Sequence, residues 1–175
     1  QLVFGGKAHP QDGESKELIR RVIERAGYLK NAVRFVYVED YNMRWAQLIT
    51  SGVDLWLNTP RRPQEASGTS GMKAALNGVP SLSVLDGWGI EGHAEGATGW
   101  AIGTDEELYE DSSAEAASLY DKLEQTILPT FYGRPSHFAE IMRSTIALNG
   151  SFFNSQRMLS QYVANAYFRE KEQSG

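Results

Sequence analysis

The chain has 175 residues, 41% of them hydrophobic and 22% charged, a composition typical of one folded domain of ordinary size. Its 17 Lys and Arg against 22 Asp and Glu give a formal net charge of −5, which argues against nucleic acid or an anionic membrane as a partner. The absence of cysteine excludes a disulfide scaffold, a thiolate metal site and a cysteine nucleophile, and no apolar run could span a membrane, so we expect a cytoplasmic protein.

The chain begins at Gln1, without an initiator Met, and enters an apolar run at once, so we expect a fragment cut just before a buried strand. Apolar runs rich in Val, Ile, Leu and aromatic residues predict strands at residues 2–4, 32–38, 53–57, 81–85 and 100–102. Helical spacing of apolar residues predicts helices around residues 16–26, 43–52, 70–77, 114–128, 136–148 and 156–168. Pro129, Pro135 and Gly150 are expected to separate the last helices, and the polar tail from Arg169 to Gly175 is expected to fray.

Strands that alternate with helices, each strand apolar throughout, favour the α/β class: a doubly wound, Rossmann-like parallel sheet covered on both faces. We expect residues 1–104 to form this core. From Glu106 onward the pattern is helical, and residues 105–175 are expected to pack as helices on the same domain. We see no internal repeat.

The loop after the third expected strand is the first place to look for a ligand, because open α/β sheets bind ligands beyond the carboxyl ends of their strands. Here Gly68, Gly71 and three hydroxyl side chains stand directly before a helix, so backbone N–H groups can converge on an anion at its N-terminus. Lys73 follows in the same helix. The spacing fits neither the Walker pattern nor the dinucleotide fingerprint, so the residues alone indicate an anion site with a nearby lysine.

Residues 65–78, Glu-Ala-Ser-Gly-Thr-Ser-Gly-Met-Lys-Ala-Ala-Leu-Asn-Gly, resemble the pyridoxal-phosphate attachment signature of the glycogen, starch and maltodextrin phosphorylases. Segments at residues 5–8, 36–41, 85–87 and 153–158 are also similar to that family, so the resemblance covers nearly the whole chain. Residues 58–63 and 88–92 look more like the shorter bacterial and archaeal branch. The resemblance implies the C-terminal half of a two-domain glycosyltransferase of the GT-B type.

The resemblance also implies roles for individual residues. Lys73 would hold pyridoxal 5′-phosphate as a Schiff base, with Tyr41 packed near the cofactor ring. The cofactor's phosphate would lie against Gly68, Thr69 and Ser70. Glu65, with the backbone of Ala66, Ser67 and Gly68, would face hydroxyls of the transferred glucosyl unit. Lys73 and Glu65 are thus the expected catalytic residues.

The implied reaction is phosphorolysis of terminal α-1,4-linked glucose by inorganic phosphate, giving α-glucose 1-phosphate. The implied partners are an α-1,4-glucan, phosphate and the N-terminal domain of the same enzyme, and a homo-oligomer is compatible with the family. Because the family's phosphate-gripping Lys and Arg lie upstream of this segment, we expect the chain alone to be inactive. Two alternatives stay open: half of a nucleotide-sugar glycosyltransferase, which would bind a diphosphate in the same loop, and a non-catalytic glucan-binding fragment.

Other conspicuous residues have simpler interpretations. The three histidines, His9, His93 and His137, lack ligand spacing, so no metal site is expected. Arg61 and Arg62 are as consistent with a solvated turn as with a phosphate contact. Asp86 and Glu91 could form an acid–base pair, although the resemblance favours a structural role for Asp86. Core or interface packing is the simplest role for the tryptophans Trp45, Trp56, Trp88 and Trp100.

Overall fold

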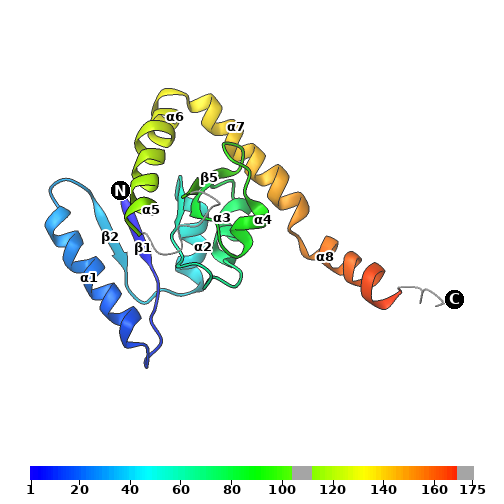
Figure 1. Cartoon of the computed structure of the whole chain (residues 1–175), viewed down its shortest axis with the longest axis horizontal. Coiled ribbons are helices and arrows are strands. Elements are labelled where there is room, and N and C mark those ends of the chain that lie inside the picture. The colour runs from blue at the N-terminus through cyan, green and yellow to red at the C-terminus, as the bar shows by residue number, and fades with distance from the viewer. Residues whose placement is uncertain (104–111, 169–175) are drawn as a thin grey trace. The chain divides into compact units, whose positions relative to one another are not determined.

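The computed structural model describes residues 1–103 and 112–168. The expected α/β class is confirmed, and all strand pairings between named strands are parallel, as the apolar strands predicted. The chain divides into two compact units, residues 1–49 and residues 50–175. Figure 1 labels the helices and strands of both units.

The first unit contains a parallel strand pair and a long helix. Its elements are β1 (Leu2–Gly5), α1 (Gly13–Leu29), β2 (Phe35–Val38) and most of α2 (Met43–Gly52). In β1 and β2, Leu2 pairs with Phe35 and Gly5 with Val38. The rings of Phe4 and Phe35 stack with their centroids 4.8 Å apart, which is a favourable aromatic arrangement.

Helix α1 begins where its sequence provides a cap. The Asp12 carboxylate accepts a hydrogen bond from the Ser15 backbone N–H at 2.9 Å, which satisfies one of the free donors of the first turn. Further along, the Arg20 guanidinium pairs with both Glu17 and Glu24, one turn away on either side. The predicted helix around residues 16–26 is therefore confirmed and extends a few residues beyond each predicted end.

The second unit is built on three strands in the order β3–β4–β5. They are β3 (Trp56–Asn58), β4 (Ser81–Val84) and β5 (Gly99–Ile102). Ser81 of β4 lies opposite Trp56 on one side and Gly99 on the other. Gly99 has φ +152°, and a Cβ atom there would overlap the Ser81 carbonyl oxygen, so only glycine allows this close approach.

The helices of the second unit lie between and after these strands. They are α3 (Thr69–Leu76), α4 (Trp88–Gly92), α5 (Ser112–Asp121), α6 (Leu128–Gly133), α7 (Pro135–Thr145) and α8 (Ser155–Tyr162). The chain is π-helical between α5 and α6 over Lys122–Ile127, and π-helical segments also extend α7 over Ile146–Gly150 and α8 over Val163–Tyr167.

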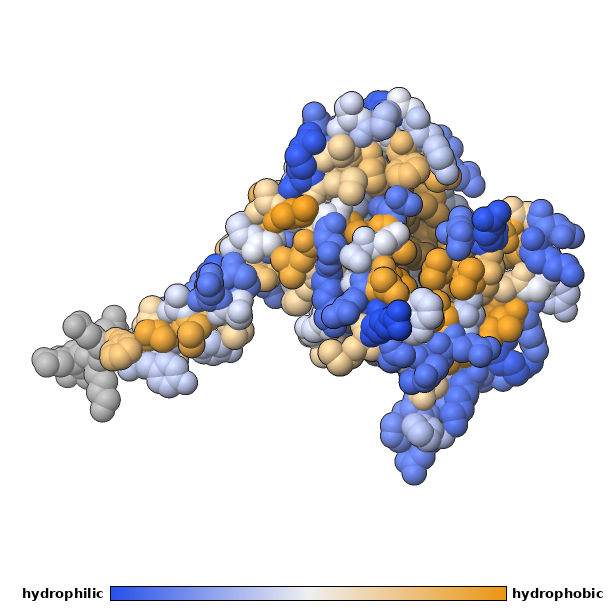
Figure 2. All heavy atoms as spheres, turned by 180° about the vertical axis from the view of Figure 1, so that it is seen from behind, coloured by the Kyte–Doolittle hydropathy of each residue, from blue (hydrophilic) through white to orange (hydrophobic). Residues whose placement is uncertain are grey.

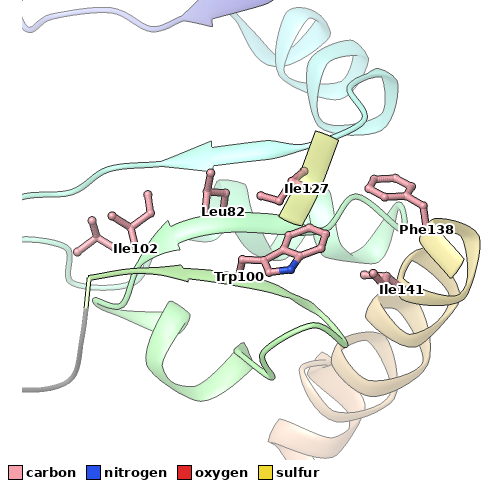
Figure 3. Close-up of a cluster of buried hydrophobic side chains, with 7 residues drawn as sticks. Leu82, Trp100, Ile102, Ile127, Phe138 and Ile141 are labelled. Atoms are coloured by element: carbon pink, nitrogen blue, oxygen red, sulfur yellow. The ribbon is translucent and has the colours of Figure 1, made fainter. Parts of the chain in front are cut away.

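The hydrophobic core of this unit joins the strands to the later helices. Leu82, Val84, Trp100 and Ile102 come from β4 and β5, and Figure 3 shows side chains of this group lying toward Ile127, Phe138 and Ile141 of the helical segments. These seven residues are each at most 5% exposed. The helical segments that carry Ile127, Phe138 and Ile141 therefore belong to the same core as β4 and β5.

Helix α3 contacts β3, β4, α4 and the π-helical segment Ile146–Gly150, and its buried face consists of small residues. Gly71, Ala74 and Ala75 are its buried positions, and the two alanines are at most 1% exposed. The helix ends at Asn77, and Gly78, with φ +76°, reverses the chain toward β4. The short side chains let the helix axis approach the strands closely.

Three local features differ from the sequence expectations. Strands β2 and β3 begin at Phe35 and Trp56, so the expected strands at residues 32–38 and 53–57 both start too early. Helix α4 was not predicted, because its five residues include two glycines. The helical stretch that was expected to stop at Pro129 continues to Gly133. Pro129 lies in the first turn of α6, where a missing backbone N–H is tolerated. The π-helical segment ends directly before it, with a hydrogen bond from the Leu128 N–H to the Leu123 carbonyl.

Two sequence expectations concern segments that lie outside the described residues. These are the helical pattern at residues 106–111 and the polar tail at residues 169–175. The predicted boundary between residues 104 and 105 also lies outside the described residues.

Helix α8 and its π-helical extension carry an exposed apolar stripe. No residue of either segment is buried, and Figure 2 shows apolar side chains gathered next to the grey terminal residues. The stripe consists of Met158, Leu159, Tyr162 and Val163. None of the described helices is long and apolar enough to cross a bilayer.

Candidate functional site

A cleft lies along β3 and β4 and reaches the start of α3. It encloses about 430 Å³ of space, including its open mouth. Its polar lining residues are Asn58, Glu65, Ser81, Ser83, His93, Thr98 and Asn149, and Trp56 and Trp88 contribute aromatic surface. The cleft therefore runs along β3 and β4 from their first residues, Trp56 and Ser81, and it includes Glu65 and Gly68 of the loop where the sequence predicted a ligand site.

The loop of residues 65–70, called the cradle loop below, leads directly into α3. Gly68 is the residue before the helix and adopts the left-handed conformation, with φ +83° and ψ +43°. The backbone N–H groups of Gly68, Thr69 and Ser70 donate no hydrogen bond to any part of the chain that the structure describes. Three consecutive free amides at a helix start are a favourable arrangement for a phosphate or carboxylate group.

Lys73 is the fifth residue of α3 and lies on its exposed side, opposite the buried alanines. Its ammonium group forms neither an ion pair nor a hydrogen bond with residues 1–103 or 112–168, and its carbonyl accepts a hydrogen bond from Asn77 at 2.8 Å. The amine is therefore available to a ligand. It lies one turn beyond Thr69, past the first turn where the helix dipole acts most strongly.

Glu65 begins the cradle loop and points into a polar network. Its carboxylate oxygen Oε2 accepts a hydrogen bond from Asn58 Nδ2 at 2.8 Å, and the same nitrogen lies 3.3 Å from Ser83 Oγ. A Cβ atom on Gly68 would lie 3.0 Å from Glu65 Oε1, so the carboxylate packs against the residue that starts the helix. The carboxylate and the free amides are thus parts of one short segment.

The structure brings most of the predicted site residues together in this segment. Ala66, Ser67 and Thr69 are exposed, whereas Glu65, Gly68 and Ser70 are half-buried. Tyr41 belongs to the first unit, where its ring lies over Gly5: a Cβ atom there would be 2.8 Å from Tyr41 Cδ2.

The other residues singled out from the sequence have structural contacts. His93 Nε2 lies 3.1 Å from Glu95, which also pairs with Lys122. Asp86 is buried and its carboxylate accepts two backbone hydrogen bonds, while Glu91 is exposed on α4. Within the described residues no group of three or more His, Asp or Glu side chains could hold a metal ion.

Asn58 and Ser83 belong to the site but were not singled out from the sequence. Asn58 ends β3 after two apolar residues, and Ser83 stands between Leu82 and Val84 in β4; these polar interruptions are the signal that could have identified them. Parallel strands bring such positions together at one sheet edge, because Asn58 and Ser83 are paired in the ladder.

The chain is an α/β protein with a candidate anion site. A polar cleft lies along its parallel strands, and a loop with free amides leads into a helix that carries a lysine. Comparison with known proteins identifies the family. The sequence profile of the carbohydrate phosphorylases matches residues 1–120. The chain belongs to the carbohydrate phosphorylase family.

Individual relatives are similar along almost the whole chain. The maltodextrin phosphorylase of Thermococcus litoralis is 43% identical over 169 residues, covering 95% of this chain and 20% of the relative. The glycogen phosphorylase of Aquifex aeolicus is 41% identical across all of this chain and 26% of the relative. That of Mycobacterium tuberculosis is 39% identical over 95% of this chain and 20% of the relative. The chain thus spans about a fifth to a quarter of the length of these relatives.

Proposed function

We propose that this chain is the cofactor-binding C-terminal part of an α-glucan phosphorylase of the short bacterial and archaeal type. The complete enzyme would transfer terminal α-1,4-linked glucosyl units to inorganic phosphate and release α-glucose 1-phosphate. The family membership supports this reaction class. The observation that carries the assignment to these residues is the run of three amides at Gly68, Thr69 and Ser70, which have no acceptor within the described residues and stand one turn before the Lys73 amine.

The site residues fit pyridoxal 5′-phosphate, the cofactor that the family implies. The free amides would bind its phosphate group, and the Lys73 amine would bond covalently to its aldehyde carbon. When bound, the cofactor supplies a phosphate that can exchange a proton with the substrate phosphate. Tyr41 would pack near the cofactor ring.

The chain's own polar groups would orient the sugar. Glu65 is held by Asn58 and presents a carboxylate that can accept hydrogen bonds from glucosyl hydroxyls. The backbone of Ala66, Ser67 and Gly68 would add further polar contacts. Fixing the glucosyl unit in this way lowers the entropy cost of bringing it to the attacking phosphate.

The proposed architecture follows from the same assignment. Residues 1–104 would form a doubly wound, Rossmann-like core in the C-terminal half of a GT-B enzyme, and residues 105–175 would be helices on the same domain. The packing of Ile127, Phe138 and Ile141 on the core strands supports the second part. The N-terminal domain of the enzyme would form the other wall of the active site, in a cytoplasmic protein.

Covalent trapping tests the assignment. The complete protein is incubated with pyridoxal 5′-phosphate, reduced with borohydride and digested, and the modified peptide is identified by mass spectrometry. We expect the adduct on Lys73. In Lys73→Ala, both the adduct and the release of glucose 1-phosphate from maltodextrin should be lost. Lys30→Ala is the matched control, because Lys30 is an exposed lysine at the end of α1. Full activity in Lys73→Ala, or a protein without any bound vitamin B6 derivative, would refute the proposal.

The same preparation separates the alternatives. Binding of UDP- or ADP-glucose without trapping on Lys73 would favour a nucleotide-sugar transferase. Affinity for maltodextrin without any cofactor would favour a glucan-binding fragment. Residues 1–175 expressed alone should release no glucose 1-phosphate, because relatives with the proposed activity are four to five times as long. Sedimentation would give the oligomeric state.

A further inference from the structure

The turn after β4, residues 85–88, crosses beneath the cradle loop and bonds it directly. Asp86 is buried, and its two carboxylate oxygens accept hydrogen bonds from the backbone N–H groups of Glu65 and Gly87, each at 2.9 Å. The Glu65 amide is thereby fixed from a strand that is distant in sequence. Bonds to a buried carboxylate are among the stronger hydrogen bonds in proteins.

A second bond and a packing contact come from Trp88. Its backbone N–H donates to the Ser67 carbonyl at 2.7 Å. Its indole ring lies between Gly71 of α3 and Gly92 of α4: a Cβ atom on Gly71 would be 3.3 Å from the ring, and one on Gly92 would overlap it. The indole therefore requires glycine at position 92, and it packs tightly against Gly71.

The backbones of the turn and the cradle loop are themselves in close contact at Gly87. This residue has φ +53°, and a Cβ atom there would lie 2.8 Å from the Glu65 carbonyl oxygen and 2.9 Å from that of Ser67. No larger residue could occupy the position without moving the loop. The turn thus contacts the cradle loop at Glu65 and Ser67 and contacts α3 at Gly71.

We propose that Asp86 and Trp88 are the positioning residues of the cradle loop, which hold its free amides and the Glu65 carboxylate in their binding geometry before any ligand arrives. What the loop binds rests on the proposed function, whereas the positioning rests on the contacts above. A glycine-containing loop that had to be ordered by its ligand would lose conformational entropy on binding. The contacts with the turn order the loop when the protein folds, so less conformational entropy is lost on binding and the loop binds its anion more tightly.

Hydrogen exchange measures the positioning without any ligand. In the complete protein, exchange is followed by mass spectrometry in peptides that cover residues 64–72. Asp86→Ala should speed exchange at the Glu65 amide about tenfold or more, as expected for the loss of a hydrogen bond to a charged group. Asp86→Asn, which keeps one acceptor oxygen, should give a smaller increase. Peptides from α7 should be unchanged, which shows that the variants are folded.

Asp121→Asn is the matched control, because Asp121 is an exposed carboxylate at the end of α5 that makes no cap hydrogen bond. Titration of the apoproteins with pyridoxal 5′-phosphate provides the second measurement. Asp86→Ala and Trp88→Phe should bind it about tenfold more weakly than Asp121→Asn does. These variants should still be trapped on Lys73 at saturating concentration.

The two measurements separate this proposal from the proposed function. If wild-type protein does not bind the cofactor but Asp86→Ala still speeds exchange in residues 64–72, the function fails and the positioning role stands. If the cofactor binds and exchange in this segment is the same in Asp86→Ala, Asp86→Asn and Asp121→Asn, the positioning role is wrong. Should Asp86→Ala fail to fold, the same comparison is made with Asp86→Asn and Trp88→Phe.

Discussion

Gly68→Ala changes the one left-handed residue of the cradle loop. An L-residue in this conformation costs roughly 1–2 kcal/mol relative to glycine. In addition, the new Cβ would lie 3.0 Å from Glu65 Oε1 and 3.1 Å from its Cδ, which pushes the carboxylate away from the helix start. The loop can relieve the strain only by leaving the geometry in which its amides are presented to a ligand.

Gly103 provides a matched control, because it has nearly the same backbone conformation without the neighbours. Its φ is +82°, against +83° for Gly68, and a Cβ atom on Gly103 would meet no described atom within 4 Å. Gly68→Ala and Gly103→Ala should therefore each lower the free energy of unfolding in urea by about 1–2 kcal/mol. Only Gly68→Ala should also weaken binding of pyridoxal 5′-phosphate to the apoprotein, by about 5–30-fold.

The comparison can refute the reasoning in two ways. If both variants weaken cofactor binding equally, the effect follows from global stability, and the cradle loop has no special role. If Gly68→Ala binds the cofactor as tightly as wild type while losing stability, the left-handed conformation is not needed for binding.

Three further predictions concern the core, a strand contact and an ion pair of the second unit. Leu82→Ala should lower the free energy of unfolding by about 3–5 kcal/mol, because Leu82 is fully buried; a loss below about 1 kcal/mol in urea denaturation would contradict the described core. Gly99→Ala should cost about 4 kcal/mol or more, since its Cβ would overlap Ser81, and an unchanged melting temperature would speak against the β4–β5 register. At Glu95 burial raises the pKa, but hydrogen bonds from Lys122 and the Ala101 N–H outweigh it, so the pKa lies below its usual value of 4.5. The stabilisation is therefore fully present above pH 4.5 and is lost as the pH falls through the lowered pKa, and Glu95→Gln should flatten the acid limb of a stability–pH curve.

The elements of the fold could be predicted largely from apolar spacing. Short strands rich in apolar residues and helices with one apolar face give recognisable patterns, and the parallel direction follows from helices between strands. Helix α4 could not be predicted in this way, because the Trp88 indole between two helices stabilises it rather than any local propensity. The continuation through Pro129 depends likewise on a π-helical turn that no residue pattern announces.

The candidate site could be predicted in part. The loop before α3 is continuous in sequence, so its glycines, its hydroxyls and Lys73 were visible together. Asn58, Ser83 and the Asp86 contacts come from strands that only the folded sheet brings to the loop. The hydrogen-bonded partners are separated by 7 residues (Asn58 and Glu65) and 25 residues (Asn58 and Ser83) in the sequence. No periodic pattern links positions so far apart, so only the folded structure shows that they are in contact.

The alanine face of α3 has a mechanical consequence for the lysine on the opposite side. The buried positions of this helix are Gly71, Ala74 and Ala75, so its neighbours pack close to its backbone, and we expect the helix to move as one body with them. The Lys73 Cα atom should then move little relative to the rest of the unit, and rotation about the side-chain bonds of Lys73 sets where its amine can reach. An aldehyde bound to this amine would be attached through a flexible side chain on a rigid helix, so any change in its position would come from the Lys73 side chain and not from the backbone.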